Sequence, residues 1–147
     1  MKLMLLEKEH IDSITIDILT AIKIAHPDYN DVSIANFYSF IHTGLYRMVA
    51  FYEHIEKPEG FFVFQINDDL LTGKKIFFIN LLYAWSSLEN LHTKLFNEVV
   101  QFAQTYKCDV IQSFVQESKL LKILEQFPVR RMTFCEYALT SKNNISI

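Results

Sequence analysis

Glycine, proline and cysteine are all scarce in this chain of 147 residues, which contains three glycines, three prolines and two cysteines. Two cysteines without a pairing pattern argue against a disulfide framework and favour a reducing compartment. Cys108 and Cys135 are therefore expected to pack as small buried hydrophobic residues. Few glycines also argue against loops that hold a phosphate with open backbone, because such loops depend on residues without side chains.

The chain also lacks a charge surplus and a long apolar run. It has 14 basic and 17 acidic residues and a formal net charge of −3, whereas nucleic-acid binding depends on an excess of positive charge. The longest charge-free stretches, 32–46 and 76–88, are shorter than the roughly 20 residues that span a membrane. Charged residues at 7–9 interrupt the apolar start too early for a secretory signal. We expect a cytoplasmic protein that binds neither nucleic acid nor membrane.

Hydrophobic residues make up 50% of the chain, which is enough for one compact core. No repeat, linker or low-complexity tract divides it, so we expect a single domain over 1–147 with a frayed tail of a few residues. Isoleucines at helical spacing predict a first helix over 11–25, ended by His26-Pro27. A second helix is predicted from Asp31 or Ser33 to Gly44.

Three segments rich in aromatic and β-branched residues follow, at 47–55, 61–67 and 76–84. Turn-forming residues separate them, which predicts antiparallel neighbours. Five phenylalanines crowd two of these strands on both faces: Phe61, Phe62, Phe64, Phe77 and Phe78. A sheet covered by helices on both faces explains them better than an exposed aromatic surface, although both interpretations are open.

The second half of the chain alternates helix and strand. Ser86 and Glu89 have the spacing of a capping box, which predicts that a long helix with an apolar stripe from Leu88 to Tyr106 begins there. A strand over 109–115, a helix over 120–127 and a last strand over 129–139 are then expected. A helix between two strands joins parallel neighbours, so the sequence predicts a mixed, mostly antiparallel α/β sheet flanked by helices.

This order of elements, over roughly residues 1–140, resembles the fold of the GCN5-related N-acetyltransferases. A local similarity is LLKILEQF before the last strand, where the family's helix ends in Gly-Phe; here Phe127 is kept and Gln126 replaces the glycine. The resemblance implies a loop after the central strand whose backbone amides hold the pyrophosphate of acetyl coenzyme A.

The motif positions of that loop would fall on Ser87, Asn90 and His92, and none of them matches the family's residues. Glu89 would place a negative charge inside the anion pocket, and no glycine lies between Gly73 and the carboxy terminus. If the cofactor still binds, the resemblance implies contacts from the following residues: Ser86, Ser87, Asn90, Leu91 and His92.

The resemblance also implies a carboxylate that accepts the proton of the amine and a tyrosine that protonates the departing thiolate. Residues 76–87 contain no acidic side chain, and no tyrosine lies between Tyr106 and Tyr137. Glu53 as the base and Tyr83 as the proton donor are the candidates in an active enzyme. The structural alternatives are a solvated strand residue for Glu53 and a ring at the edge of the core for Tyr83.

No metal site is expected, because the five histidines are scattered over different elements and only Glu7 and His10 have a ligand-like spacing. The sequence thus predicts an acetyltransferase-like fold that has lost acetyl coenzyme A and needs no cofactor. It would serve as a structural or accessory protein, of bacterial or phage origin, that binds a protein partner or a second copy in the host cytoplasm or a virion. The alternative is an active N-acetyltransferase with a divergent cofactor loop.

Overall fold

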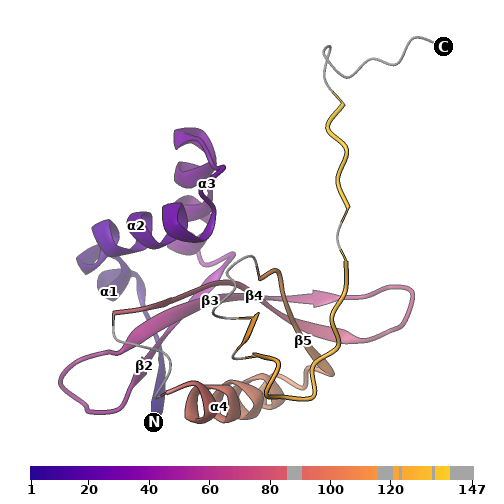
Figure 1. The fold of residues 1–147 in the computed structure, drawn as a ribbon. Helices are drawn as coiled ribbons and strands as arrows, with labels where there is room; N and C mark the ends of the chain where they lie inside the picture. The colour runs from indigo at the N-terminus through magenta and orange to yellow at the C-terminus, as the bar shows by residue number, and fades with distance from the viewer. Residues whose placement is uncertain (86–90, 116–120, 123, 134, 140–147) are drawn as a thin grey trace.

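A computed structural model describes residues 1–85, 91–115, 121–122, 124–133 and 135–139. Its elements lie around one sheet, with α1, α2 and α3 on one face and α4 on the other (Figure 1). In chain order they are β1 (Lys2–Leu5), α1 (Lys8–Ser13), α2 (Thr15–Ala25), α3 (Asp31–His42), β2 (Arg47–Tyr52), β3 (Gly60–Asp68), β4 (Lys75–Ala84), α4 (His92–Thr105) and β5 (Val110–Ser113). No described helix has the length and apolar character needed to cross a bilayer.

The sheet has the strand order β1-β2-β3-β4-β5. Neighbours from β1 to β4 pair antiparallel, and β5 pairs parallel with β4 after the crossover through α4. The predicted mixed, mostly antiparallel sheet flanked by helices is therefore confirmed. β1 was not expected, because four residues are too few to show an alternating pattern.

Strand β3 divides the core into two layers because its side chains alternate between the faces. Phe61 and Val63 pack with the helices α1 to α3, whereas Phe62 and Phe64 pack with α4. All four side chains, and Phe77 on β4, are fully buried. The interpretation of the aromatic strands as a sheet covered on both faces is confirmed for these residues.

The first helix of the sequence prediction is two helices. α1 ends at Ser13, and Ile14 has φ −121° and ψ 25° before α2 begins. Side-chain hydroxyls bond to the backbone at this point: Ser13 Oγ donates to the His10 carbonyl and Thr15 Oγ1 to the Asp12 carbonyl. Such local bonds compete with the helical ladder, which explains the break.

The face under α4 is closed by rings and aliphatic side chains. Leu95, Val99 and Ala103 of α4 are buried against the phenylalanines of β3 and β4. Phe64 and Phe77 stack with centroids 4.5 Å apart, and Phe102 meets both rings edge-on. Offset and edge-on pairs of this kind stabilise a core beyond the area they bury.

Two boundaries differ from the sequence prediction. β2 ends at Tyr52 and not at residue 55. α4 begins at His92, while the predicted capping box at Ser86 and Glu89 lies outside the described residues.

The predicted last strand over 129–139 is wrong for residues 129–133 and 135–139, which belong to no strand and are all exposed. A strand is stable only beside a neighbour, and the later part of this segment, 135–139, extends away from the sheet (Figure 1). Cys135 is consequently exposed, contrary to expectation, whereas Cys108 packs at the edge of the α4 layer.

Gly60 tests how tightly the sheet is packed. A methyl group there would overlap the Tyr83 carbonyl oxygen and the Phe51 ring, and would lie 2.8 Å from Ala84 Cα. We expect Gly60→Ala to lower the free energy of unfolding by about 1–3 kcal/mol or more, measured by urea denaturation. Gly73→Ala is the control: Gly73 has φ +70° but open space around it, so only backbone strain of about 1 kcal/mol is expected. Equal losses would contradict the packing at Gly60.

Candidate functional site

The sheet opens where β4 and β5 part. β4 pairs with β5 only over Ile76–Ile79, although β4 itself continues to Ala84. Its last five residues thus have no strand partner on the β5 side within the described part of the chain. Of the candidate residues from the sequence, Tyr83 lies on this unpaired part of β4, and Leu91 and His92 lie at the start of α4, the next described helix.

A β-bulge lies at the same point. Val63 is paired with Leu81 and Phe64 with Ile79, so Asn80 is the extra residue of β4. Asn80 Nδ2 is buried and has no hydrogen-bond partner in the structure as described. A bulge redirects a side chain, and a buried unpaired donor calls for an explanation such as a bound group. Sequence reasoning missed Asn80, since only the register reveals a bulge.

Tyr83 lies on the face of the sheet that carries α1 to α3. Its ring is half-buried, 5.4 Å from the Phe61 ring and 5.8 Å from the Trp85 ring between centroids. It is one of the partly buried residues packed against the first core layer. This placement agrees with the structural alternative, a ring at the edge of the core.

Glu53 lies just after β2 and is engaged in ion pairs. Lys94 Nζ of α4 donates to Glu53 Oε2 at 3.1 Å, and the amino group of Met1 lies 3.9 Å from Oε1. The hydrogen bond from Lys94 is the main cause of a lowered pKa of the Glu53 carboxyl, and the positive charges of Lys94 and of the amino terminus act in the same direction. The interpretation of Glu53 as a solvated strand residue is wrong, because its side chain is only 20% exposed and paired.

The structure does not bring the two catalytic candidates together. Glu53 is held by α4, which covers one face of the sheet, while Tyr83 packs against Phe61 on the other face. A general base and a proton donor must both reach the same reacting atoms. A carboxylate with a lowered pKa is also a weaker base. Glu53 and Tyr83 thus make their contacts with different layers of the structure.

A different carboxylate lies on the Tyr83 side of the sheet. Trp85 Nε1 donates to Asp17 Oδ1 of α2 at 3.5 Å, and the Trp85 ring lies against Tyr83. Asp17 is half-buried near the end of β4. Sequence reasoning missed it because only the packing of α2 on β4 brings residues 17 and 85 together.

The start of α4 is the place where the resemblance puts a cofactor diphosphate. Leu91 is the N-cap and its side chain makes no capping hydrogen bond. His92 Nε2 is 3.0 Å from Gln126 Oε1, and its ring lies 6.3 Å from Phe127. Phe127 in turn stacks on Phe96 at 4.0 Å. Ser86, Ser87 and Asn90 lie outside the described residues.

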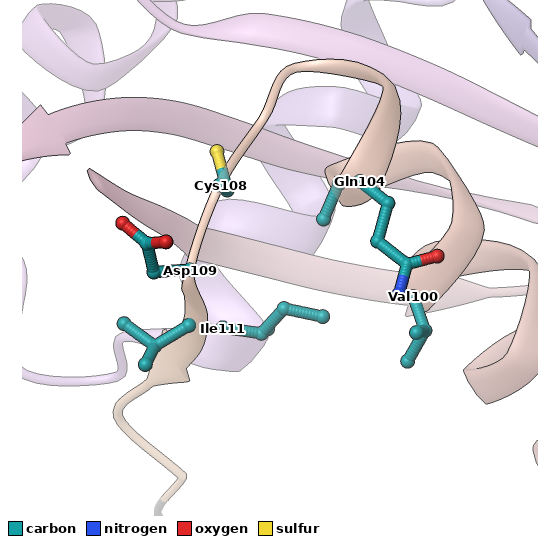
Figure 2. A pocket seen from close by; sticks show the side chains of 7 residues that line it. Val100, Gln104, Cys108, Asp109 and Ile111 are labelled. Carbon is teal, nitrogen blue, oxygen red and sulfur yellow. The ribbon is translucent and has the colours of Figure 1, made fainter. Parts of the chain in front are cut away.

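Two shallow hollows are present elsewhere. One, of about 200 Å³, lies between the end of α4 and β5 (Figure 2), with Val100 and Gln104 on α4 and Ile111 on β5. The other, of about 220 Å³, lies between β1, α1 and the end of α3. Drug-sized ligands need about 300–1,000 Å³. Neither hollow touches the end of β4 or the start of α4.

The carboxylate that lines the hollow in Figure 2, Asp109, forms hydrogen bonds to the backbone of β4. Asp109 Oδ2 accepts from the Lys75 amide at 2.8 Å, and the Asp109 amide donates to the Lys75 carbonyl. Burial is the main cause of a raised pKa of the Cys108 thiol. A thiol with a raised pKa is a poor nucleophile, so this hollow shows no nucleophilic site.

Glu7 and His10, the pair with ligand-like spacing, cap α1. The Glu7 amide donates to His10 Nδ1 at 3.3 Å. His42 Nε2 lies 2.9 Å from Asp12 Oδ1 and links α3 to α1. Within the described ranges no three His, Cys, Asp or Glu side chains gather as metal ligands.

Comparison with known proteins identifies the fold. A probable acetyltransferase is similar with a TM-score of 0.71 at 14% identity, over 95% of this chain and 97% of that chain. A ribosomal-protein-alanine N-acetyltransferase from Brucella melitensis biovar Abortus 2308 gives 0.66 at 10% identity, over 95% and 99%. An aminoglycoside acetyltransferase from an uncultured soil metagenomic sample, in complex with trehalose, gives 0.66 at 11%, over 95% and 96%.

No protein-family model and no curated protein sequence matches the chain. The structural likenesses show the fold of the GCN5-related N-acetyltransferases and, at these identities, the fold alone.

The Glu53 ion pair predicts part of the decrease in the free energy of unfolding at acid pH. Because the folded pKa of Glu53 lies below the unfolded one, its contribution to stability is present above the unfolded pKa, about 4.3, and is lost as the pH falls through the folded pKa. We expect Glu53→Gln to reduce the loss of unfolding free energy between pH 6 and pH 3, measured by urea denaturation. The matched control is Glu56→Gln in the exposed loop, which should respond to acid like the parent chain. Identical pH profiles for all three would contradict the ion pair.

Proposed function

We propose that this chain is an acetyltransferase-fold domain that does not transfer acyl groups and that binds a polypeptide partner at the outer edge of the sheet, along β5. The observation that carries the proposal is that Lys94 of α4 binds the Glu53 carboxylate, whereas Tyr83 packs in the core layer under α1 to α3. A proton donor and a base must both reach the same reacting atoms.

The cofactor side supports the same proposal. A coenzyme diphosphate needs free amides at a helix start and backbone that side chains leave open. The chain has no glycine after Gly73, and a leucine, Leu91, is the N-cap of α4. His92 in the first turn is already engaged with Gln126. These residues favour a helix start that packs against residues 124–127 over one that holds an anion.

The outer edge of β5 offers exposed backbone groups and an apolar side chain to which a polypeptide can bind. β5 is one of the two outer strands in the described part of the chain, and Ile111, Gln112 and Ser113 are exposed along it. An exposed edge presents unpaired backbone groups to which an extended segment can add as a further strand. Main-chain hydrogen bonds would supply the affinity, and the exposed Ile111 would contribute apolar contact.

A second candidate function, an active N-acyltransferase, is favoured by two observations. Asn80 Nδ2 is a buried donor without a described partner at the bulge, and Asp17 lies beside Trp85 near Tyr83. In that case Asp17 would replace Glu53 as the base, acetyl coenzyme A would lie against residues 86–92, and the acceptor would be a nitrogen, as the name of the ribosomal-protein-alanine N-acetyltransferase gives for that protein. This route needs the anion site that the residues at the start of α4 disfavour.

Both cysteines carry free thiols, which supports a reducing setting. We place the protein in the cytoplasm of its host, as an accessory protein of a bacterium or phage.

Titration with acetyl coenzyme A separates the two functions. A ligand at 100 times its dissociation constant stabilises a protein by about 2.7 kcal/mol, which raises the melting temperature by several degrees at this size. We expect no rise up to millimolar acetyl coenzyme A. ATP at the same concentration controls for unspecific anion effects. A saturable rise with acetyl coenzyme A but not with ATP would refute the proposed function.

A further inference from the structure

The turn between β3 and β4 carries the two most exposed large apolar side chains among the described residues. Leu70 is 94% exposed and Leu71 is 98% exposed. The turn extends beyond the neighbouring strands of the sheet (Figure 1). Two adjacent apolar side chains at the tip of a hairpin are unfavourable in water, so their position indicates a contact with another surface.

Hydrogen bonds within the turn hold the backbone that carries the leucines. The Gly73 amide donates to the Asp69 carbonyl at 2.8 Å, and the Asp69 amide donates to the Lys74 carbonyl at 2.9 Å. Asp69 Oδ1 accepts from the Leu71 amide at 3.0 Å. Hydrogen bonds from Leu71 and Thr72 are the main causes of a lowered pKa of the Asp69 carboxyl. The leucines are therefore presented by an ordered backbone, which reduces the entropy lost when a partner binds them.

A hollow that can receive them lies at the same end of the sheet. The hollow of about 200 Å³ between the end of α4 and β5 has these apolar lining residues (Figure 2): Val100, Ala103, Cys108, Val110 and Ile111. Space of this size suits aliphatic side chains better than a drug-sized ligand. Asp109 joins the hollow to the hairpin, because its amide donates to the Lys75 carbonyl at 2.8 Å. The four residues from Leu71 to Lys75 span at most about 13 Å, so the turn and the hollow are close neighbours on one molecule.

We propose that the leucines of the β3–β4 turn of one copy insert into the hollow between α4 and β5 of a second copy, and that the contact is reciprocal. A contact about a two-fold axis uses the same surface of both chains, and each chain here carries both halves of the contact side by side. The assembly therefore closes as a dimer with two insertions. The inference goes beyond the proposed function, because it joins two copies whatever the outer edge of β5 binds.

The charges beside the leucines favour this hollow over the other one. Lys74 follows the leucines, and the Asp109 carboxylate lines the hollow; both residues are exposed. Opposite charges across a contact favour association and fix its orientation. The hollow between β1, α1 and the end of α3 is lined by the basic residues Lys8, His42 and Arg47, and by no acidic one among the described residues. Lys74 would meet charges of its own sign there.

The composition of the turn favours a protein surface over a lipid surface. Residues 68–75 contain two acidic and two basic side chains. Segments that enter a membrane interface gain from an excess of positive charge beside their apolar residues, because many membrane surfaces are negative. This turn has no such excess, and the whole chain has a formal net charge of −3. The apolar hollow of a second copy is therefore the better match for the leucines.

Light scattering during size-exclusion chromatography tests the dimer. At about 100 µM, well above the dissociation constants typical of specific interfaces, we expect a mass twice the 17.3 kDa of one chain. The double variant Leu70→Ser and Leu71→Ser should have the mass of one chain. The control, Ile16→Ser with Ile55→Ser, removes side chains that are 80% and 87% exposed outside the turn and the hollow, and it should remain a dimer.

Two results of this measurement would overturn the proposal. One is a parent chain with the mass of a monomer, and the other is a dimer that survives the loss of both leucines. A monomeric parent that sediments with phosphatidylcholine vesicles, while the leucine variant does not, would assign the leucines to a lipid surface instead.

Crosslinking between two chains of different mass tests which surface receives the leucines. Both chains carry Cys108→Ala and Cys135→Ala, so that each has one engineered thiol. One chain carries Thr72→Cys, which keeps both leucines of the turn, and the other, lengthened by an affinity tag, carries Gln104→Cys beside the hollow. A short bis-maleimide should give a product that contains one chain of each kind. Glu56→Cys, in the exposed β2–β3 loop, replaces Gln104→Cys in the control and should give none. A dimer that yields no mixed product with Gln104→Cys, or one that yields it with Glu56→Cys, has another interface and contradicts the proposal.

The failure of this inference is distinguishable from that of the proposed function. A monomer that does not respond to acetyl coenzyme A keeps the proposed function and overturns the dimer. A dimer that responds to acetyl coenzyme A keeps the inference and refutes the proposed function.

Discussion

The structure depends on one constraint: the strands β2, β3 and β4 are apolar on both faces, so the sheet must be covered from both sides. Val49, Phe51, Phe62 and Phe64 on one face require α4, and Met48, Phe61, Val63 and Leu81 on the other require α1 to α3. A single α-helix between β4 and β5 supplies the first cover and makes those strands parallel. The order of the layers follows from this coverage of both faces. So does the change from antiparallel pairing of β3 with β4 to parallel pairing of β4 with β5.

The same constraint places on different layers two residues, Glu53 and Tyr83, that the sequence analysis combined as a base and a proton donor. Side chains on opposite faces of a filled sheet are divided by buried rings; Glu53 is bonded to Lys94 of α4, whereas Tyr83 packs with the layer under α1 to α3. The groups that do meet are those that helix packing selects, such as Asp17 of α2 with Trp85 at the end of β4. A fold shared with acetyltransferases therefore does not imply their chemistry, because the chemistry depends on which face each group occupies.

Coverage also decides where the sheet can still accept a partner. Within the described residues β1 and β5 are the two outer strands, and Ile111, Gln112 and Ser113 are exposed along β5. The β4–β5 ladder stops at Ile79 and Ser113, beside the bulge at Asn80.

The sequence by itself determined the strongly patterned elements: α3 behind Asn30, the three antiparallel strands, α4 and its apolar stripe, and the double-sided burial of the phenylalanines. These follow from periodicity and from residues close in sequence. Only the tertiary structure decided the break at Ile14, the Lys94–Glu53 pair, the bulge at Asn80 and the fact that 129–133 and 135–139 form no strand. Three of these depend on how residues distant in sequence are placed relative to one another, and the break depends on hydroxyl groups that compete for backbone carbonyls. No local pattern encodes any of the four.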